Sequence, residues 1–264
     1  MSITITNQQL KIAHDIYLDR IHEANLYLAL INNINSGYDK LSNRDGHTID
    51  IGRELKHTLY ASTYLILYNI IESTSVAIID AIHEDIKLND ISENELNDRL
   101  YKRLLKQLGN YLSGKTGSDQ VGALNMPASK SMYIELLNLA HSKSTIFSGN
   151  VDLLKLKVIA EDYGFSTTPL EGEPYDPYDL LVIKSLRNDL AHGSYSFSEC
   201  GKEVTFLESA EVVKTIMHIN GTPKEVEVTT ITKKFESVER LFNALFKNLN
   251  DYLREQNYLH KESL

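Results

Sequence analysis

The sequence predicts a mainly α-helical bundle that contains a small β insertion. Apolar side chains recur every three to four residues over several long stretches, which is the spacing of one helix face. Cap residues stand at the ends of these stretches. The 264 residues are 42% hydrophobic and 24% charged, which is typical of a globular chain that buries its own core.

The first helices are long. The apolar spacing predicts a helix over residues 10–34, and the Asn, Ser, Gly and Asp content of residues 33–48 predicts a loop. Asp50 is the expected N-cap of a second helix that runs to about residue 86. This second helix is apolar on nearly every side, as is usual for the central helix of a bundle.

A capping-box pattern marks the next helix. Ser92 is followed three residues later by Glu95, so a helix is expected from this serine to Leu112. Further short helices are expected over residues 130–140 and 151–163.

Local signals define both ends of another helix after the acidic loop at residues 166–177. Asp176 is the expected N-cap, Pro177 occupies the first helical position, and Asp179 stands two residues further on. Gly193 is the expected stop, because glycine accepts the left-handed conformation that ends many helices.

The apolar period changes after this helix. Residues 194–207 alternate around a Cys-Gly pair and predict a β-hairpin, and residues 218–232 predict a second hairpin or a helix end followed by a strand. Residues 235–259 predict the last helix. We expect a single domain over 1–264 with a β-containing insertion at 194–232.

Charge and cysteine content limit the function classes. The net charge of −9 argues against broad nucleic-acid binding, which needs clustered Lys and Arg, but it permits a local RNA site or a basic partner. The single cysteine, Cys200, cannot form an intramolecular disulfide. The first residues lack a signal-peptide pattern, and the apolar stretch 64–71 is too short to span a bilayer. We therefore expect a cytoplasmic protein without membrane contact.

Residues 109–116, GNYLSGKT, match the P-loop pattern with Lys115 as its lysine. A P-loop needs a strand before it and a helix after it, so that backbone N–H groups hold the phosphates. Here an amphipathic helix precedes the pattern, which favours a helix end with a glycine stop. A P-loop ATPase is the weaker alternative, and it predicts ATP binding through Lys115.

The stretch SLRNDLAHG, residues 185–193, places Arg187 and His192 at the end of the capped helix. Arginine offers a fixed fork of donors to a phosphate, and a histidine near neutral pH can take or give a proton. Metal-free RNA cleavage needs both functions. The spacing alone is common, and a helix-end Arg and His that cap and form salt bridges are the alternative.

Helix geometry adds a requirement for this pair. Positions five apart diverge by about 140° on a helix, because each residue turns by about 100°. The Arg187 and His192 side chains of one helix therefore converge poorly on one phosphate. Two copies of the helix across a twofold axis could form a composite cleft that does so better. An enzyme built on Arg187 and His192 is expected to be a symmetric homodimer.

The run RNDLAHG resembles the Arg-x(4–6)-His signature of the HEPN (higher eukaryote and prokaryote nucleotide-binding) family, and residues 65–82 resemble the core helix before it. The resemblance implies an all-α bundle of four or five core helices and frequent homodimers. It implies a metal-independent endoribonuclease of a toxin–antitoxin, abortive-infection or other anti-phage system. In that pattern Arg187 and His192 are catalytic, and Asn188 is the intervening polar residue.

Three residues are expected to support the pair. Asn188 positions one catalytic side chain or bonds the phosphate, and Glu72, in the apolar centre of the long helix, is expected to orient the Arg187 guanidinium. Toxins paired with nucleotidyltransferase antitoxins continue the motif as His-x-Tyr. Here Tyr195 comes one residue later, which departs from that version.

The sequence thus predicts a metal-independent endoribonuclease with Arg187 and His192 at a homodimer cleft, without cofactor or metal. RNA is the expected substrate, and an antitoxin or defence protein is a possible partner. The alternative is a non-catalytic module that binds a nucleotide or a protein through the same cleft.

Overall fold

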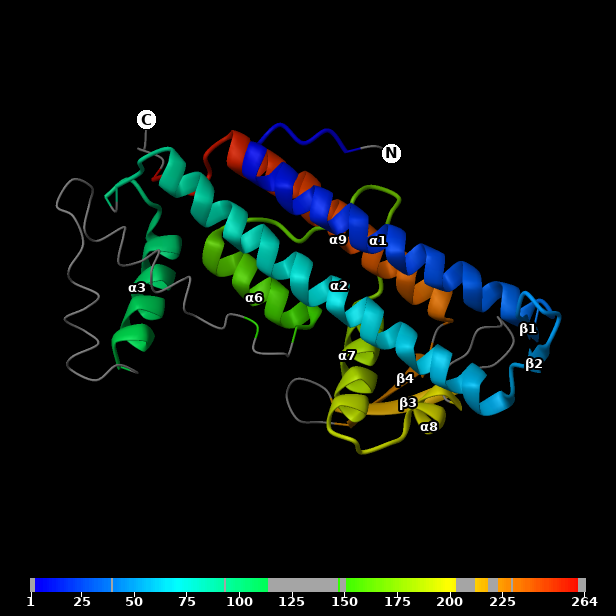
Figure 1. Ribbon diagram of the computed structural model, residues 1–264. Helices are drawn as coiled ribbons and strands as arrows, with labels where there is room; N and C mark the ends of the chain where they lie inside the picture. Colours follow the sequence, from blue (N-terminus) through cyan, green and yellow to red (C-terminus); the bar gives the residue numbers. More distant parts are fainter. Residues whose placement is uncertain are drawn as a thin grey trace.

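The computed structural model describes residues 3–38, 40–92, 94–113, 147, 151–202, 212–217, 223–228 and 230–260. Its helices are α1 (Gln8–Asn35), α2 (Arg53–Leu88), α3 (Asp98–Ser113), α6 (Leu153–Tyr163), α7 (Pro177–Ala191), α8 (Phe197–Lys202) and α9 (Ile231–Arg254) (Figure 1). Two antiparallel hairpins pair β1 (Lys40–Ser42) with β2 (Thr48–Asp50) and β3 (Val212–Met217) with β4 (Pro223–Val228). The predicted mainly α-helical fold is confirmed.

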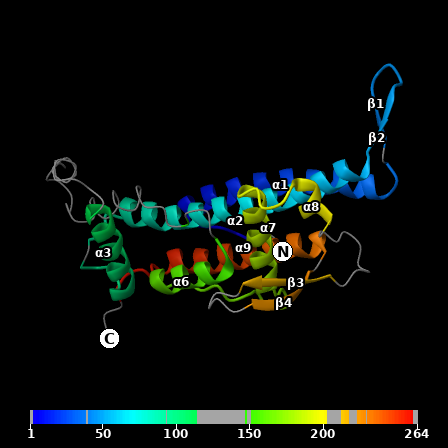
Figure 2. The same cartoon turned by 90° about the horizontal axis from the view of Figure 1, so that it is seen from below.

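The long helices form two layers. Figure 2 shows α1 and α2 side by side in one layer, with α9 and α6 in the other. The short helices α3 and α7 run across these layers, and the β1–β2 hairpin projects beyond one end of the bundle. α7 therefore meets α2 at a steep angle, which leaves the C-terminal end of α7 near the surface of the first layer.

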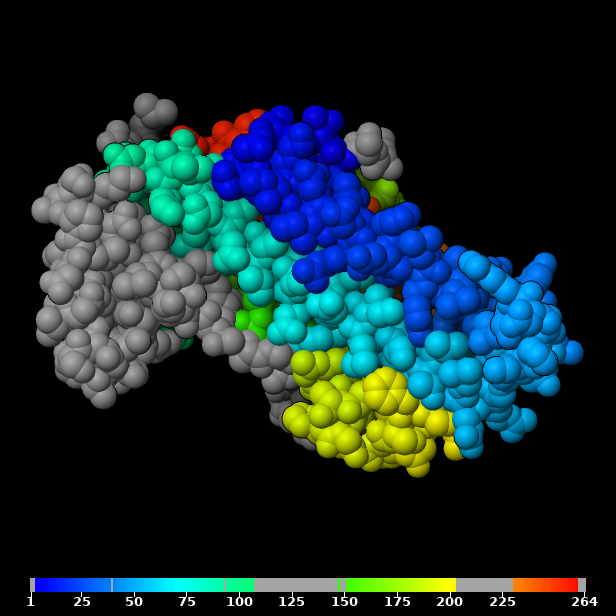
Figure 3. Space-filling view, in the orientation of Figure 1, coloured from blue at the N-terminus to red at the C-terminus, as the bar shows by residue number. Residues whose placement is uncertain are grey.

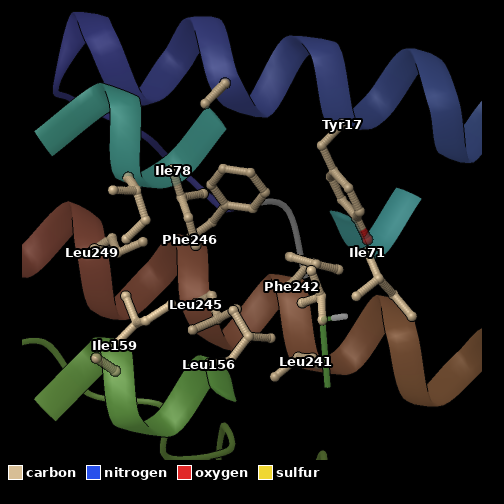
Figure 4. Close-up of a cluster of buried hydrophobic side chains, with 14 of the residues drawn as sticks. Tyr17, Ile71, Ile78, Leu156, Ile159, Leu241, Phe242, Leu245, Phe246 and Leu249 are labelled. Atoms are coloured by element: carbon tan, nitrogen blue, oxygen red, sulfur yellow. The ribbon is translucent and has the colours of Figure 1, made fainter. Parts of the chain in front are cut away.

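A continuous apolar core joins the two layers. Aromatic side chains link α1 to α9, with the ring centroids of Tyr17 and Phe246 5.4 Å apart (Figure 4). Phe246 is fully buried, as are Ile71 and Ile78 of α2. Complete burial of one such side chain contributes about 1.5–3 kcal/mol. The core therefore fixes α2 between α1, α7 and α9.

α2 is the one helix in the described part of the chain that has the length and apolar composition of a membrane span. However, 56% of its most apolar window is buried inside the protein, as in the core helix of a helical bundle. The all-round apolarity of α2 is thus accounted for by packing on several helices.

A buried polar group fixes the start of α7. The Asp179 carboxylate accepts a hydrogen bond of 2.6 Å from the Ser237 hydroxyl of α9, and the Lys234 ammonium lies 4.0 Å away. Lys234 is 0% exposed, and burial lowers its pKa to about 8, although Asp179 and Asp176 oppose this shift. Ser237 also accepts from the backbone N–H of Asp176 at 3.2 Å.

A second polar group closes the far end of the bundle. The buried Asp85 carboxylate of α2 accepts hydrogen bonds from the Asn7 amide at 2.6 Å and from the Tyr258 hydroxyl at 2.9 Å. Asn7 is also the N-cap of α1. Nearby, His83 and the Tyr163 hydroxyl share a hydrogen bond of 2.8 Å.

Some predicted boundaries in the N-terminal half were wrong. The stretch expected to be loop contains the β1–β2 hairpin, and Asp50 ends β2, so Gly52 is the N-cap of α2. The Glu95 carboxylate accepts from the Ser92 N–H, as in a capping box, but the Ser92 hydroxyl does not accept from the Glu95 N–H, and α3 begins only at Asp98. The helix expected over residues 130–140 lies outside the described residues.

The C-terminal half brings one correction of element type. The hairpin expected over residues 194–207 is wrong, because residues 197–202 form α8. Only β4 lies within the second expected range, 218–232; its partner β3 lies before that range, and the two strands pair from Val212 with Val228 to Met217 with Pro223. The last helix begins at Ile231, four residues earlier than expected, behind the N-cap Thr230.

Candidate functional site

Local sequence determines both ends of α7, as expected. Asp176 accepts from the Tyr178 N–H at 2.9 Å, and Pro177 occupies the first turn. At the other end Gly193 has a φ of +67°, and the Gly193 and Ser194 N–H groups bond back to Leu190 and Asp189. This is the Schellman arrangement, which favours glycine at that position. It places His192 at the last residue before the turn.

Arg187 is held against α2 by an aromatic ring. Its guanidinium carbon lies 4.6 Å from the centroid of the Tyr68 ring, which is cation–π geometry. Its Nη1 donates to the side-chain oxygen of Asn188 at 3.1 Å. The Tyr68 hydroxyl in turn accepts from the backbone N–H of Val151 at 3.0 Å. The arginine is half-buried and oriented by two neighbours before any ligand binds.

Glu72 lies one turn beyond Tyr68 on α2 and is half-buried. Burial raises the pKa of Tyr68, the Glu72 carboxylate adds to this rise, and the Arg187 guanidinium opposes it. Glu72 and Arg187 therefore act on the same phenol from two helices. The role of Glu72 in orienting Arg187 stays a prediction, which this proximity supports.

Sequence reasoning missed Tyr68. It lies in the apolar stretch of α2, where a tyrosine looks like one more core residue. Its position four residues before Glu72 was the available signal, because residues four apart share a helix face.

His192 caps the C-terminal end of α7 and is exposed. Its backbone N–H donates to Asn188 at 2.9 Å, but its imidazole makes no hydrogen bond or ion pair with any described residue. Tyr195 follows in the turn before α8 and is 53% exposed. Figure 3 shows the α7–α8 segment (yellow) beside α2 (cyan) on one face of the molecule.

α8 fixes this turn from its other side. A Cβ atom on Gly201 would lie 1.8 Å from the carbonyl oxygen of His57, so only glycine allows α8 to approach α2 so closely. Cys200 is buried there with Ala61 and Leu190. The turn that carries His192 is therefore held between two short helices, both packed on α2.

Arg187 and His192 point in different directions within one chain. Arg187 packs toward Tyr68, whereas the His192 imidazole faces solvent, and no hydrogen bond joins the two side chains. This arrangement agrees with the divergence of about 140° expected for positions five apart. If both side chains act on one phosphate, the arginine and the histidine must therefore come from two different copies of the chain.

The other candidate motif lies in an unsuitable context. Residues 109–113 of the GNYLSGKT stretch belong to the end of α3, so a helix stands where a P-loop requires a strand. Lys115 and Thr116 lie outside the described residues. Within the described ranges, no three His, Cys, Asp or Glu side chains are grouped so that they could hold a metal ion.

A comparison with protein-family models gives a match to a HEPN family, described as MAE_28990-like HEPN, over residues 18–258. The match covers α2 and the whole of α7, including Arg187 and His192. No curated protein and no solved structure matches this chain.

Proposed function

The chain belongs to the HEPN family, and from that premise we propose that it is a metal-independent endoribonuclease whose active site combines Arg187 and His192 in a homodimer. The observation that carries this proposal is the arrangement around Arg187. The guanidinium is oriented by Tyr68 and Asn188, while the imidazole of His192 remains open to solvent at the end of the same helix.

The proposed reaction is a transesterification within the RNA. A His192 imidazole takes the proton of the 2′-hydroxyl, and the 2′-oxygen attacks phosphorus. The bond from phosphorus to the 5′-oxygen breaks, and this oxygen takes a proton from the imidazolium of a second copy. Arg187 binds the phosphate and stabilises the charge that develops on its oxygens. The products carry a 2′,3′-cyclic phosphate and a 5′-hydroxyl.

The homodimer supplies what one chain lacks. Because Arg187 and His192 of one copy diverge, a twofold axis near the end of α7 brings the histidine of each copy toward the arginine of the other. Tyr195 then lies in the turn next to this axis, where it supports the cleft.

The experiment is cleavage of total cellular RNA and tRNA in EDTA by the wild type, His192→Ala and Arg187→Ala. We expect both variants to lose about 10²–10⁴-fold in rate. Since His192 is exposed and unpaired among the described residues, its variant should keep the wild-type melting temperature. Equal cleavage by wild type and His192→Ala would refute the proposal.

A non-catalytic module is the second candidate, and one observation favours it. Arg187 is already engaged by Tyr68 and Asn188, as a purely structural arginine would be. This candidate predicts that neither the wild type nor any variant cleaves RNA. Arg187→Ala and His192→Ala should instead change the binding of a nucleotide or a protein.

We further propose a cytoplasmic role in phage defence or toxin–antitoxin growth arrest, which is what HEPN ribonucleases commonly do. Expression of the wild type should then arrest growth, and the His192→Ala variant should not. A controlling antitoxin or defence protein should copurify with the inactive variant.

A further inference from the structure

A row of charged residues runs along α6, beside the Arg187 site. Asp152 is the N-cap of α6, where it accepts from the Lys155 N–H at 2.9 Å and pairs with Lys184 of α7 at 2.5 Å. Nearly three turns further along, Asp162 pairs with Arg103 of α3 at 3.2 Å. Lys155 and Asp162 are seven residues apart, so they share one face of the helix.

The charges in this row do not balance. Asp152 and Asp162 are each engaged by another cation, while the Lys155 ammonium has no ion pair or hydrogen bond with any described residue. Lys155 is half-buried, and its ammonium lies 5.8 Å from the centroid of the Phe147 ring. The Phe147 ring and the Asp152 and Glu72 carboxylates replace only part of the solvation that this partly buried cation has lost, because burial outweighs them in lowering its pKa.

Electrostatics and hydrogen bonding support the same conclusion. Burial lowers the pKa of Lys155, and Lys184 and Arg103 lower it further, although Asp152 and Glu72 oppose them. Arg103 donates to Asp162 through Nη1 alone, and its buried Nε has no acceptor. Both cations therefore have unused capacity for an anion.

This row is continuous with the proposed active site. Glu72 acts on Lys155 and also on Tyr68, the ring beneath Arg187. Asp152 acts on the same two groups, and Lys184 stands one turn before Arg187 on α7. An anionic chain bound at Arg187 can therefore extend along α6.

We propose that Lys155, Arg103 and Lys184 form a second phosphate site, the Lys155 site, which binds the RNA backbone beside the phosphate held by Arg187. This proposal rests on the proposed function, since it takes RNA as the ligand. A phosphodiester supplies the acceptor that the Lys155 ammonium lacks, and a polyanion can reach this site and Arg187 at once.

The test is RNA binding with a single-stranded oligonucleotide at several salt concentrations, in the His192→Ala background so that the RNA stays intact. Lys155→Gln should weaken binding by about five- to tenfold at low salt and reduce the slope of log K against log salt by about 0.7. The matched control is Lys157→Gln, which removes an exposed lysine on another face of α6 and should bind as the parent does.

Stability distinguishes a binding role from a structural one. Because the Lys155 ammonium has no described hydrogen bond or ion pair to lose, Lys155→Gln should keep or raise the melting temperature. RNA should raise the melting temperature of the parent more than that of this variant. Inorganic phosphate serves as a second probe, and a Lys155-dependent effect of phosphate without one of RNA would overturn the proposal.

The two proposals fail in different ways. Equal RNA binding by the Lys155→Gln and Lys157→Gln variants overturns the Lys155 site, whatever the cleavage assay gives. Lys155-dependent RNA binding without cleavage by the wild type supports the Lys155 site and refutes the nuclease. Absence of measurable RNA binding overturns the Lys155 site directly.

Discussion

At its N-terminal end α7 is fixed by buried polar groups, whereas at its C-terminal end it presents polar groups to solvent. Asp179 is 3% exposed and lies between Ser237 and Lys234 of α9. Thirteen residues further along the sequence, His192 is exposed, and so is Ser194 beyond Gly193. One helix thus combines a rigid support with an open end, and the open end carries the residues that have to meet a ligand.

The largest expected effect concerns the buried end. Asp179→Leu removes the carboxylate 4.0 Å from the Lys234 ammonium, so a fully buried cation loses the stronger of the two carboxylate interactions, with Asp179 and Asp176, that favour its charge. We expect a loss of about 3–5 kcal/mol in the free energy of unfolding, measured by urea denaturation.

Lys234→Met should cost less, because Asp179 keeps the Ser237 hydroxyl and a place in the first turn of α7. The double variant should recover part of the stability that Asp179→Leu loses. Equal losses in the two single variants would show that the lysine does not depend on this aspartate.

A pH titration sharpens the same contrast. The pKa of Lys234 is about 8 in the folded protein and 10.5 as its ordinary value. Between these values the unfolded state binds one more proton, so this lysine makes stability rise with pH, by up to about 1.4 kcal/mol per pH unit. Below about pH 8 both states are protonated and this gain is absent.

The measurement is the difference in unfolding free energy between wild type and Lys234→Met from pH 7 to 9.5, where most tyrosines remain protonated. The unfolding free energy of the wild type should rise relative to that of the variant as the pH rises. A constant difference would mean that Lys234 titrates alike in both states.

The smallest expected effect lies at the open end. Gly193→Ala places a side chain at a φ of +67°, which costs about 1–2 kcal/mol. The strained residue directly follows His192 and should displace its imidazole. The cleavage rate should therefore decrease by more than the loss of folded protein alone explains. Gly172→Ala is the matched control, since Gly172 has a φ of +74° and open space around it, and it should cost a similar stability without a further loss of cleavage.

Two copies of one sequence pattern show how far local signals reach. At Ser92 only half of the box forms: the Glu95 carboxylate accepts from the Ser92 N–H, but the Ser92 hydroxyl donates to that carboxylate, and Asn97 then donates from its backbone N–H to the Tyr258 carbonyl oxygen at 2.8 Å. Ser196 and Glu199 form the complete box, because the Glu199 N–H also donates to the Ser196 hydroxyl, and here α8 follows at once. The box could have identified α8, but apolar alternation favoured a strand.

In the candidate site, too, some features follow from local sequence and others from the packing of distant helices. Asp176, Pro177 and Gly193 fix the ends of α7 through neighbours in sequence, and these ends were predictable. Tyr68 and Lys155 gain their places from α2 and α6 packing against α7, which no local pattern records. Glu72 was proposed as a partner of Arg187 because a carboxylate in an apolar helix requires a partner, and this role stays a prediction.

The Asp85 carboxylate has a consequence for the order of synthesis. It joins Asn7, which leaves the ribosome before it, to Tyr258, which follows 173 residues later. Until Tyr258 emerges, a carboxylate that is buried in the finished protein has only one of these two donors. This pair of contacts therefore cannot be completed until the turn after α9 has been made, which is after both Arg187 and His192.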